Sequence, residues 1–264
     1  MGFKELREDV DNLTLAVSFK IITSGDKTYI QLYDENENEV DGSCAFWDSD
    51  FDCRFSGLTT LEGVPIKVHG SFDCSYNKLT SLLHSPKYLE GSFICECGFL
   101  TTLEGCPEVV YGIFDCSDNE LKNLIGAPKK VLSIDDALNG TFHCYGNPLE
   151  SIEGIPLVIE GNCVIEKKPM SLDELRGVDI GGYVIINGEK QDVPKIPTSE
   201  SIAYFLERGR DGIFTFGDVS FVVLQGLLYV YDAEKILRTF RLSRWTNRTA
   251  LIELLVEEFF CEQH

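Results

Sequence analysis

Cysteines recur along this chain at a spacing that first raises the question of metal chemistry. Five of them follow one another at steps of 21, 21, 21 and 28 residues: Cys53, Cys74, Cys95, Cys116 and Cys144. Cys95-Glu96-Cys97, with Cys106 nearby, would add thiolate ligands for a metal ion or cluster. If the repeats stack as strands, however, the cysteines lie about 4.8 Å apart with parallel side chains, which suits neither disulfides nor a tetrahedral metal. We therefore expect reduced thiols packed in a core, and we predict no metal and no cofactor.

A second series of residues alternates with the cysteines and is expected to point away from the core. With Tyr145, it forms the predicted partner-binding set: Asp52, Asp73, Ile94, Asp115, His143 and Tyr145. Adjacent carboxylates on neighbouring strands would repel at a cost of roughly a few tenths of a kcal/mol or more. The set is either a solvated face or a strip that recognises lysine and arginine side chains. Calcium is disfavoured because the aspartates lack the clustered spacing of a calcium-binding loop.

The sequence contains no recognised catalytic motif. It has four histidines and no P-loop, nucleophile elbow or paired-histidine zinc motif. We therefore predict no catalytic residues and regard an enzyme as the less favoured class.

The element that must position these side chains is a repeat. Four further classes of residue share the register of the cysteines. The aromatic class is Phe51, Phe72, Phe93, Phe114 and Phe142, and the leucine class begins with Leu58, Leu79, Leu100, Leu121 and Leu149. Prolines and glycines follow at the same steps, and the one long step is a seven-residue insertion between Pro128 and Gly140. Such periodicity is typical of a solenoid in which each unit packs on its neighbours.

The unit F-x-C-S-x-N-x-L-T-x-L-x-G-x-P resembles a leucine-rich repeat, with Phe72 and Cys74 in the two leucine places and Asn77 in the asparagine place. Its consensus sequence is similar to that of the short leucine-rich repeats of bacteriophage proteins and to that of the roughly 20-residue repeats of bacterial effectors. The resemblance covers residues 49–165 and implies stacked strands forming a parallel concave sheet, with an extended or one-turn convex side. It also implies a binding scaffold of viral origin aimed at a host protein. Asn77, Asn119 and Asn147 are expected to hydrogen-bond backbone groups, whereas Ser56 and Gly98 interrupt that series.

The flanking segments are expected to cover the two apolar ends of the solenoid. Residues 1–48 are predicted to form a β-rich cap with strands over 13–23 and 27–33. The repeats are predicted to occupy 49–166 as five to six rungs, the last of them degenerate, with Cys163 and Ile165 in the Phe and Cys places.

Residues 170–264 change in character and are predicted to form an α+β module, which makes the whole chain α+β. Ser171-Leu172-Asp173-Glu174 is typical of a capping box that opens a short helix. Further helices are expected over 201–208 and about 246–261, and a strand over 183–186 is expected to enter a hairpin at Asn187-Gly188. Four more strands are expected over 213–216, 219–224, 227–232 and 236–242. Four arginines between 238 and 248 form a basic cluster that we interpret as a solvated face.

The net charge of −20 bounds the choice of partner. Residues 1–165 carry 27 acidic and 11 basic side chains, so this part of the chain holds −16 of the total. Such a surface repels phosphate backbones, which disfavours direct nucleic-acid binding. No run approaches the roughly 20 apolar residues of a membrane span, and the start of the chain lacks the apolar segment of a secretion signal. With its reduced thiols, the chain is expected in the cytoplasm, that of the host if it is viral.

These observations favour a protein–protein interaction protein, specifically a phage-encoded one that binds or inhibits a host protein through an acidic surface. The partner is expected to present a basic surface, and the C-terminal module could also form a homo-oligomer contact. Two alternatives stay open: an enzyme with its active site in residues 170–264 and the repeats as targeting arm, and an acidic DNA mimic.

Overall fold

The structure is a computed structural model, and it describes residues 13–134, 140–170, 172–175, 178–191, 213–216, 219–224, 227–232, 235–241, 251 and 255. The chain forms two compact units. The first comprises residues 1–170 and 181–191, and the second comprises residues 171–180 and 192–264.

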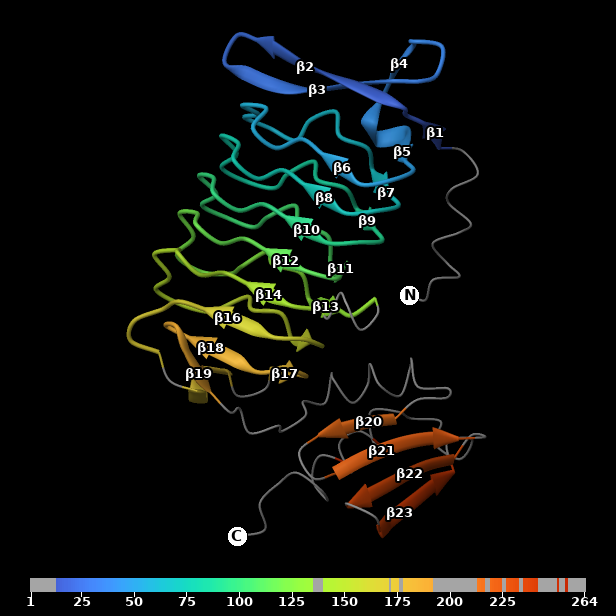
Figure 1. The fold of residues 1–264 in the computed structure, drawn as a ribbon, viewed down its shortest axis with the longest axis vertical. Helices are drawn as coiled ribbons and strands as arrows, with labels where there is room; N and C mark the ends of the chain where they lie inside the picture. Colours follow the sequence, from blue (N-terminus) through green and yellow to red (C-terminus); the bar gives the residue numbers. More distant parts are fainter. Residues whose placement is uncertain are drawn as a thin grey trace. The chain divides into compact units, whose positions relative to one another are not determined.

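The first unit is a solenoid of about six turns, and one side of it is an eight-stranded sheet (Figure 1). Its seven parallel strands are β6 (Phe51–Asp52), β8 (Phe72–Asp73), β10 (Phe93–Ile94), β12 (Phe114–Asp115), β14 (Phe142–His143), β16 (Cys163–Ile165) and β18 (Val184–Ile186). Phe pairs with Phe from β6 to β14, and Phe142 then pairs with Cys163. The predicted register is therefore confirmed, including the degenerate rung at Cys163 and Ile165.

The solenoid sheet extends beyond the predicted last rung. β18 pairs in parallel with β16, and β19 (Glu189–Gln191) folds back antiparallel on β18. Asn187 and Gly188 both have positive φ, as the tight hairpin between these two strands requires. The expected strand and turn are confirmed, but they belong to the solenoid unit rather than to a separate C-terminal module.

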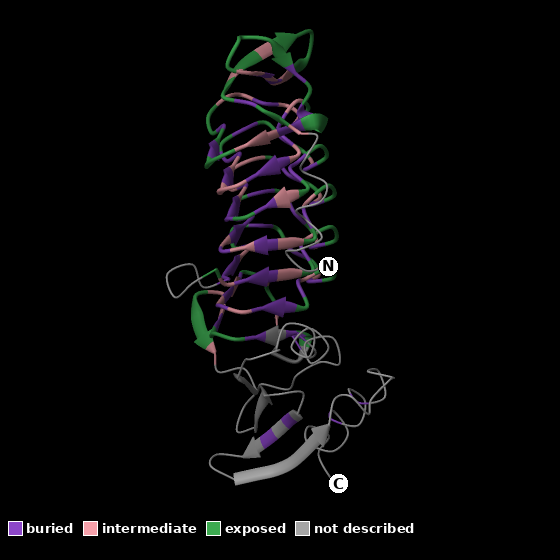
Figure 2. Ribbon diagram, turned by 90° about the vertical axis from the view of Figure 1, so that its right-hand side faces the viewer, coloured by how far each residue is buried: buried purple, intermediate pink, exposed green. Residues whose placement is uncertain are grey.

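A second strand in most turns forms another side of the solenoid. One sheet contains β1 (Thr14–Leu15), β5 (Ala45–Trp47), β7 (Lys67–Val68) and β9 (Tyr88–Leu89), and the next contains β11 (Val109–Tyr111), β13 (Lys130–Leu132) and β15 (Val158–Ile159). Glycines lie between the two strands of a turn where backbones approach closely: a Cβ on Gly91 would lie 2.7 Å from the backbone of Gly70 and Ser71. The convex side is thus extended, and both views show the turns stacked along one nearly straight axis rather than around a concave hollow (Figures 1 and 2).

The core of the solenoid is made of the repeated residues. Along the stacked strands β8 to β18, Figure 2 shows buried and half-buried residues, and many residues of the turns between them are exposed. The five phenylalanines are fully buried and stack at ring-centroid distances of 5.2 to 5.8 Å. The five cysteines of the ladder are buried and free, as expected. Each of these thiols donates to a backbone carbonyl of the next rung. Cys95 Sγ, for example, lies 3.3 Å from the backbone carbonyl oxygen of Asp115.

The N-terminal cap covers the first rung closely. It contains β2 (Ser18–Ser24), β3 (Lys27–Tyr33), β4 (Glu39–Val40) and a 3₁₀ turn at Gly42–Cys44. Phe19 and Trp47 each lie with their rings 5.0 Å from that of Phe51, which is completely buried. The predicted strand over 13–23 is two strands instead, because β1 pairs with β5 and β2 pairs with β3.

In the second unit the described residues form strands, one 3₁₀ turn and two helical positions, Leu251 and Leu255. Strands β20 (Ile213–Phe216), β21 (Val219–Leu224), β22 (Leu227–Asp232) and β23 (Lys235–Arg241) form an antiparallel sheet in chain order, close to the predicted bounds. β17 (Asp179–Ile180) also falls in this unit.

The predicted α+β class is not supported by the described residues. The capping box at Ser171–Glu174 leads only into a 3₁₀ turn at Leu172–Leu175, because four residues form a single turn. The helix expected over 201–208 lies outside the described residues. Of the last expected helix only Leu251 and Leu255 are described, and both are helical and fully buried.

Candidate partner-binding face

The candidate site lies on the outer side of the eight-stranded sheet, which we call the sheet face. Along each strand the Phe and Cys side chains point into the core, so the residues after each of them point outward. This gives two rows across the rungs. The first row is Asp52, Asp73, Ile94, Asp115 and His143, and the second is Arg54, Ser75, Glu96, Ser117 and Tyr145.

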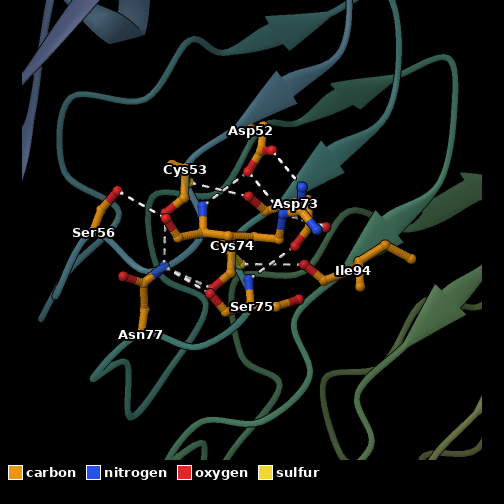
Figure 3. A network of polar contacts seen from close by, with 9 residues as sticks. Asp52, Cys53, Ser56, Asp73, Cys74, Ser75, Asn77 and Ile94 are labelled. Carbon is orange, nitrogen blue, oxygen red and sulfur yellow. Dashed lines mark hydrogen bonds and ion pairs between the residues drawn. The ribbon is translucent and has the colours of Figure 1, made fainter.

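The aspartates of the first row also hold the local backbone. In each case a carboxylate oxygen accepts from the backbone N–H two residues further on. The distances are 3.0 Å from Arg54 to Asp52, 3.0 Å from Ser75 to Asp73 and 2.9 Å from Ser117 to Asp115. Figure 3 shows this arrangement for Asp52 and Asp73, with Ile94 in the same row. These residues therefore stabilise the turn after the strand in addition to carrying charge.

At the N-terminal end of the sheet face, Arg54 neutralises negative charge of Asp52 and Asp73. Arg54 Nη2 lies 2.7 Å from Asp52 Oδ2, and its Nε lies 3.3 Å from Asp73 Oδ2. The hydrogen bond from Arg54 holds the pKa of Asp52 below its ordinary value. The expected repulsion between these two aspartates is thus offset by a guanidinium that bridges the two rungs.

The middle of the sheet face keeps its negative charge. Burial raises the pKa of Glu96, and the carboxylates of Asp115, Asp73 and Asp118 raise it further, while His143 acts in the opposite sense. Four carboxylates therefore influence one another around Glu96, which is half-buried. Arg54 is engaged with Asp52 and Asp73, so this part of the face favours a cation from outside the chain.

Asp115 is the deepest carboxylate of this group, with 12% of its side chain exposed. His143 Nδ1 lies 3.2 Å from Asp115 Oδ2. Although burial alone raises the pKa of Asp115, the hydrogen bonds from His143 and Ser117 bring it below its ordinary value. Asp115 is therefore a stable anion at neutral pH.

Two buried hydroxyl groups flank Glu96 in the second row. Ser75 is 1% exposed and Ser117 is not exposed at all, so neither hydroxyl is accessible from solvent. Ser117 Oγ is directed toward the hydroxyl of Tyr145, whose pKa is raised by burial and by Asp115, Asp118 and Glu96.

A further row, which the sequence analysis did not single out, borders the sheet face. Its members Phe55, Tyr76, Cys97, Asp118 and Gly146 follow the second row and all have positive φ. The rings of Phe55 and Tyr76 stack at 4.4 Å and are exposed. A hydrogen bond with Cys97 is the main cause that raises the pKa of Tyr76 to about 12. The sequence could have indicated this row, because its members recur at the position between the Ser and the Asn of the repeat.

The predicted set is therefore divided by the structure. Asp115, His143, Ile94 and Tyr145 lie together in the middle of the face, where the rings of His143 and Tyr145 are 6.3 Å apart. Asp52 and Asp73 form a separate group with Arg54. Glu96 and Asp118 complete the middle group, although neither was in the predicted set.

Among the described residues, no group of three His, Cys, Asp or Glu side chains is placed to hold a metal ion. The described part of the chain also contains no helix long and apolar enough to span a bilayer. Comparison of the chain with protein-family models, curated proteins and solved structures gives no match.

Proposed function

We propose that the chain is a protein-interaction protein whose sheet face binds a basic surface of its partner. The observation that carries this proposal is the cluster of Glu96 with Asp73, Asp115 and Asp118, in which burial and the three neighbouring carboxylates raise the pKa of Glu96. Arg54 is committed to Asp52 and Asp73. A basic side chain from a partner would relieve this repulsion and speed association.

The finer proposal is that the protein is phage-encoded and binds or inhibits a host protein. This proposal is supported by the similarity of the repeat sequence to that of short leucine-rich repeats of bacteriophage proteins. Stacked rungs that present variable outward residues on a constant core suit such a role, because surface residues can change without disturbing the core.

The alternatives receive less support. A DNA mimic needs continuous rows of carboxylates, whereas this face carries Ile94 in the first row and Arg54 in the second. An active site in residues 170–264 would fall largely outside the described residues, so no observation favours it.

The test is affinity capture from a bacterial lysate with wild type and with the variant Glu96→Gln/Asp118→Asn, which removes two charges from the middle of the face. Its matched control is Glu104→Gln/Glu153→Gln, which removes two charges from exposed turns. We expect captured protein to decrease for the first variant and to stay at the wild-type level for the control, with capture also decreasing as salt is raised. Equal capture by all three proteins would refute the proposal.

A further inference from the structure

The N-terminal cap presents a long free edge of β-sheet. Strand β2 is the outermost strand of the sheet β2-β3-β4, and Figure 1 shows β2 and β3 at the end of the solenoid unit. No other strand of the described residues pairs with the outer side of β2. All seven of its residues, Ser18–Ser24, pair with β3 on the inner side. The edge is therefore straight, regular and long enough to template another strand.

The register of the hairpin shows which backbone groups point out of this edge. Ile30 on β3 donates its backbone N–H to the carbonyl of Glu62 at 3.1 Å, which is away from β2. Its partner in the antiparallel register, Ile21, therefore directs its own N–H and C=O away from β3. Phe19 and Thr23 do the same, because the direction alternates along the strand. Three N–H and three C=O groups thus face outward in the pattern that an antiparallel strand would pair.

Exposed apolar side chains accompany the free edge. Leu15, Val17 and Ile21 are exposed by 41%, 48% and 37%, and they lie within seven residues of chain. Ile21 is opposite Ile30, which is completely buried, so the exposure of Ile21 comes from its place at the edge. Apolar side chains beside unpaired backbone groups are typical of a surface that another strand covers.

The usual protection of an edge strand is missing from β2. A lysine on an edge strand commonly prevents pairing, but the Nζ of Lys20 lies 4.4 Å from the ring centroid of Tyr33 on the neighbouring strand. At the other end of the solenoid unit, the edge strand β19 is only three residues long and contains Glu189 and Lys190. One end of the unit thus has a short, charged edge, whereas the other has a long and largely apolar one.

Charge and register identify a second copy of the chain as the strand that fits. Residues 13–33 contain two lysines and one aspartate, a net +1 in a chain of net −20, so two copies meet with least repulsion here. In an antiparallel pair of two β2 strands centred on Ile21, Phe19 lies opposite Thr23 and Lys20 lies opposite Ile22. No like charges face each other in this register, and both strands make identical contacts, as a two-fold axis requires.

We propose that two copies of the chain associate through antiparallel pairing of their β2 strands, with the two-fold axis at Ile21. The two three-stranded cap sheets then form one sheet of six strands. This contact lies at the cap and does not use the residues of the sheet face, so it goes beyond the proposed function and does not depend on it.

The experiment measures the mass of the full-length protein in solution by sedimentation equilibrium. Over a concentration range of about 1–200 µM we expect the weight-average mass to rise from that of one chain toward that of two. Raising the salt from about 50 mM to about 500 mM should increase the dimer fraction, because salt screens the repulsion between two acidic chains. Capture of a basic partner by the sheet face should respond to salt in the opposite direction.

Two variants of Ile21 locate the contact. Ile21→Pro removes an outward N–H and leaves the bonds between β2 and β3 in place, and Ile21→Lys places two ammonium groups opposite each other at the axis. Each should raise the dimer dissociation constant at least about tenfold. The matched control is Ile125→Lys, which makes the same change at an isoleucine of a turn that is 50% exposed. It should change the constant by less than about twofold.

Thermal unfolding checks the fold of each variant, and Ile21→Lys alone decides if Ile21→Pro does not fold. The mass of a single chain at every concentration and at both salt levels would overturn the proposal. A dimer that Ile21→Lys weakens no more than Ile125→Lys does would overturn it as well, because the contact would then lie elsewhere.

Discussion

Glu96 and Asp115 show how neighbouring rungs set opposite properties for two carboxylates of the same face. Asp115 is the more buried, yet hydrogen bonds from His143 and Ser117 hold its pKa below the ordinary value. Burial and three neighbouring carboxylates raise the pKa of the more exposed Glu96. One carboxylate is therefore satisfied within the chain, whereas the other lies among like charges.

The raised pKa of Glu96 predicts a pH-dependent effect on stability. A carboxyl whose pKa is higher in the folded than in the unfolded state destabilises the fold once it ionises. Glu96→Gln should therefore stabilise the protein at pH 7, by about 0.5 kcal/mol after solvent screening. The gain should vanish as the pH falls below the ordinary glutamate value of 4.5. Chemical denaturation at pH 7 and pH 4 measures this; a gain that is the same at both pH values would contradict it.

The ladder thiols are predicted to be unreactive in the folded protein. Burial is the first cause that raises the pKa of Cys74, Cys95, Cys116 and Cys144, and the thiolate is the reactive form. Titration with a thiol reagent at pH 8 should label exposed Cys44 rapidly and these four only after denaturation. Rapid labelling of Cys74 or Cys116 in the native state would show that the described packing is wrong.

At the scale of the element, each rung is stabilised by the rung on either side. Phe93 lies between Phe72 and Phe114, and Phe51 lies between Phe72 and the cap residues Phe19 and Trp47. The first rung is thus packed as closely as a central one. The cap therefore gives the first rung aromatic neighbours on both sides.

Phe51→Ala and Phe93→Ala are therefore predicted to cost similar amounts, roughly 3–5 kcal/mol each. Both side chains are fully buried and have aromatic neighbours on two sides, so neither void can collapse easily. Urea denaturation of the two variants measures the costs. A cost at Phe51 smaller by 2 kcal/mol or more would mean that the cap does not pack as described.

The repeated asparagines Asn77, Asn119 and Asn147 are predicted to contribute strongly to the free energy of unfolding. Asn77 Oδ1 accepts from the backbone N–H of Leu58, and Nδ2 donates to the carbonyls of Cys53, Cys74 and Ser75. Asn77→Ala leaves these buried groups without partners and should cost about 3 kcal/mol. Ser56→Ala, at the equivalent half-buried position of the first rung, should cost less than about 0.5 kcal/mol. Similar costs for the two variants would contradict this role of Asn77.

At the scale of the whole molecule, the net charge of −20 suggests that removing carboxylates would stabilise the fold. The local bonds of the sheet face lead to the opposite prediction for Asp52→Asn/Asp73→Asn/Asp115→Asn. Asparagine can keep the bond to the backbone N–H, but the charge-assisted contacts with Arg54 and His143 are lost. We expect a loss of about 1 kcal/mol.

The matched control for this triple variant removes the same charge from exposed glutamates at positions 104, 120 and 153. It should be as stable as wild type or slightly more stable, especially at low salt. Urea denaturation of both triple variants in low and high salt measures the difference. Equal stability of the two would mean that overall charge outweighs the contacts of the sheet face.

The sequence by itself determined how each rung of the solenoid is built. Repeated Phe, Cys, Leu and Asn predicted which residues enter the core, which strands pair and where the ladder bonds form, because alternation along a strand and a constant period are local properties. The strands of residues 213–241 were predicted almost to the residue for the same reason. The α+β class is not supported by the described residues: the capping box leads into a 3₁₀ turn at Leu172–Leu175, and the other two expected helices lie wholly or largely outside the described residues.

Only the tertiary structure decided which outward residues meet. Arg54 reaches Asp73 on the next rung, His143 reaches Asp115 across the insertion, and Glu96 is left among carboxylates. The period shows that these side chains point outward, but not which of them bridge, because pairing depends on side-chain length and direction across rungs. The burial of Ser75 and Ser117 was equally invisible, since it arises from neighbours 21 or more residues away that stacking brings beside them.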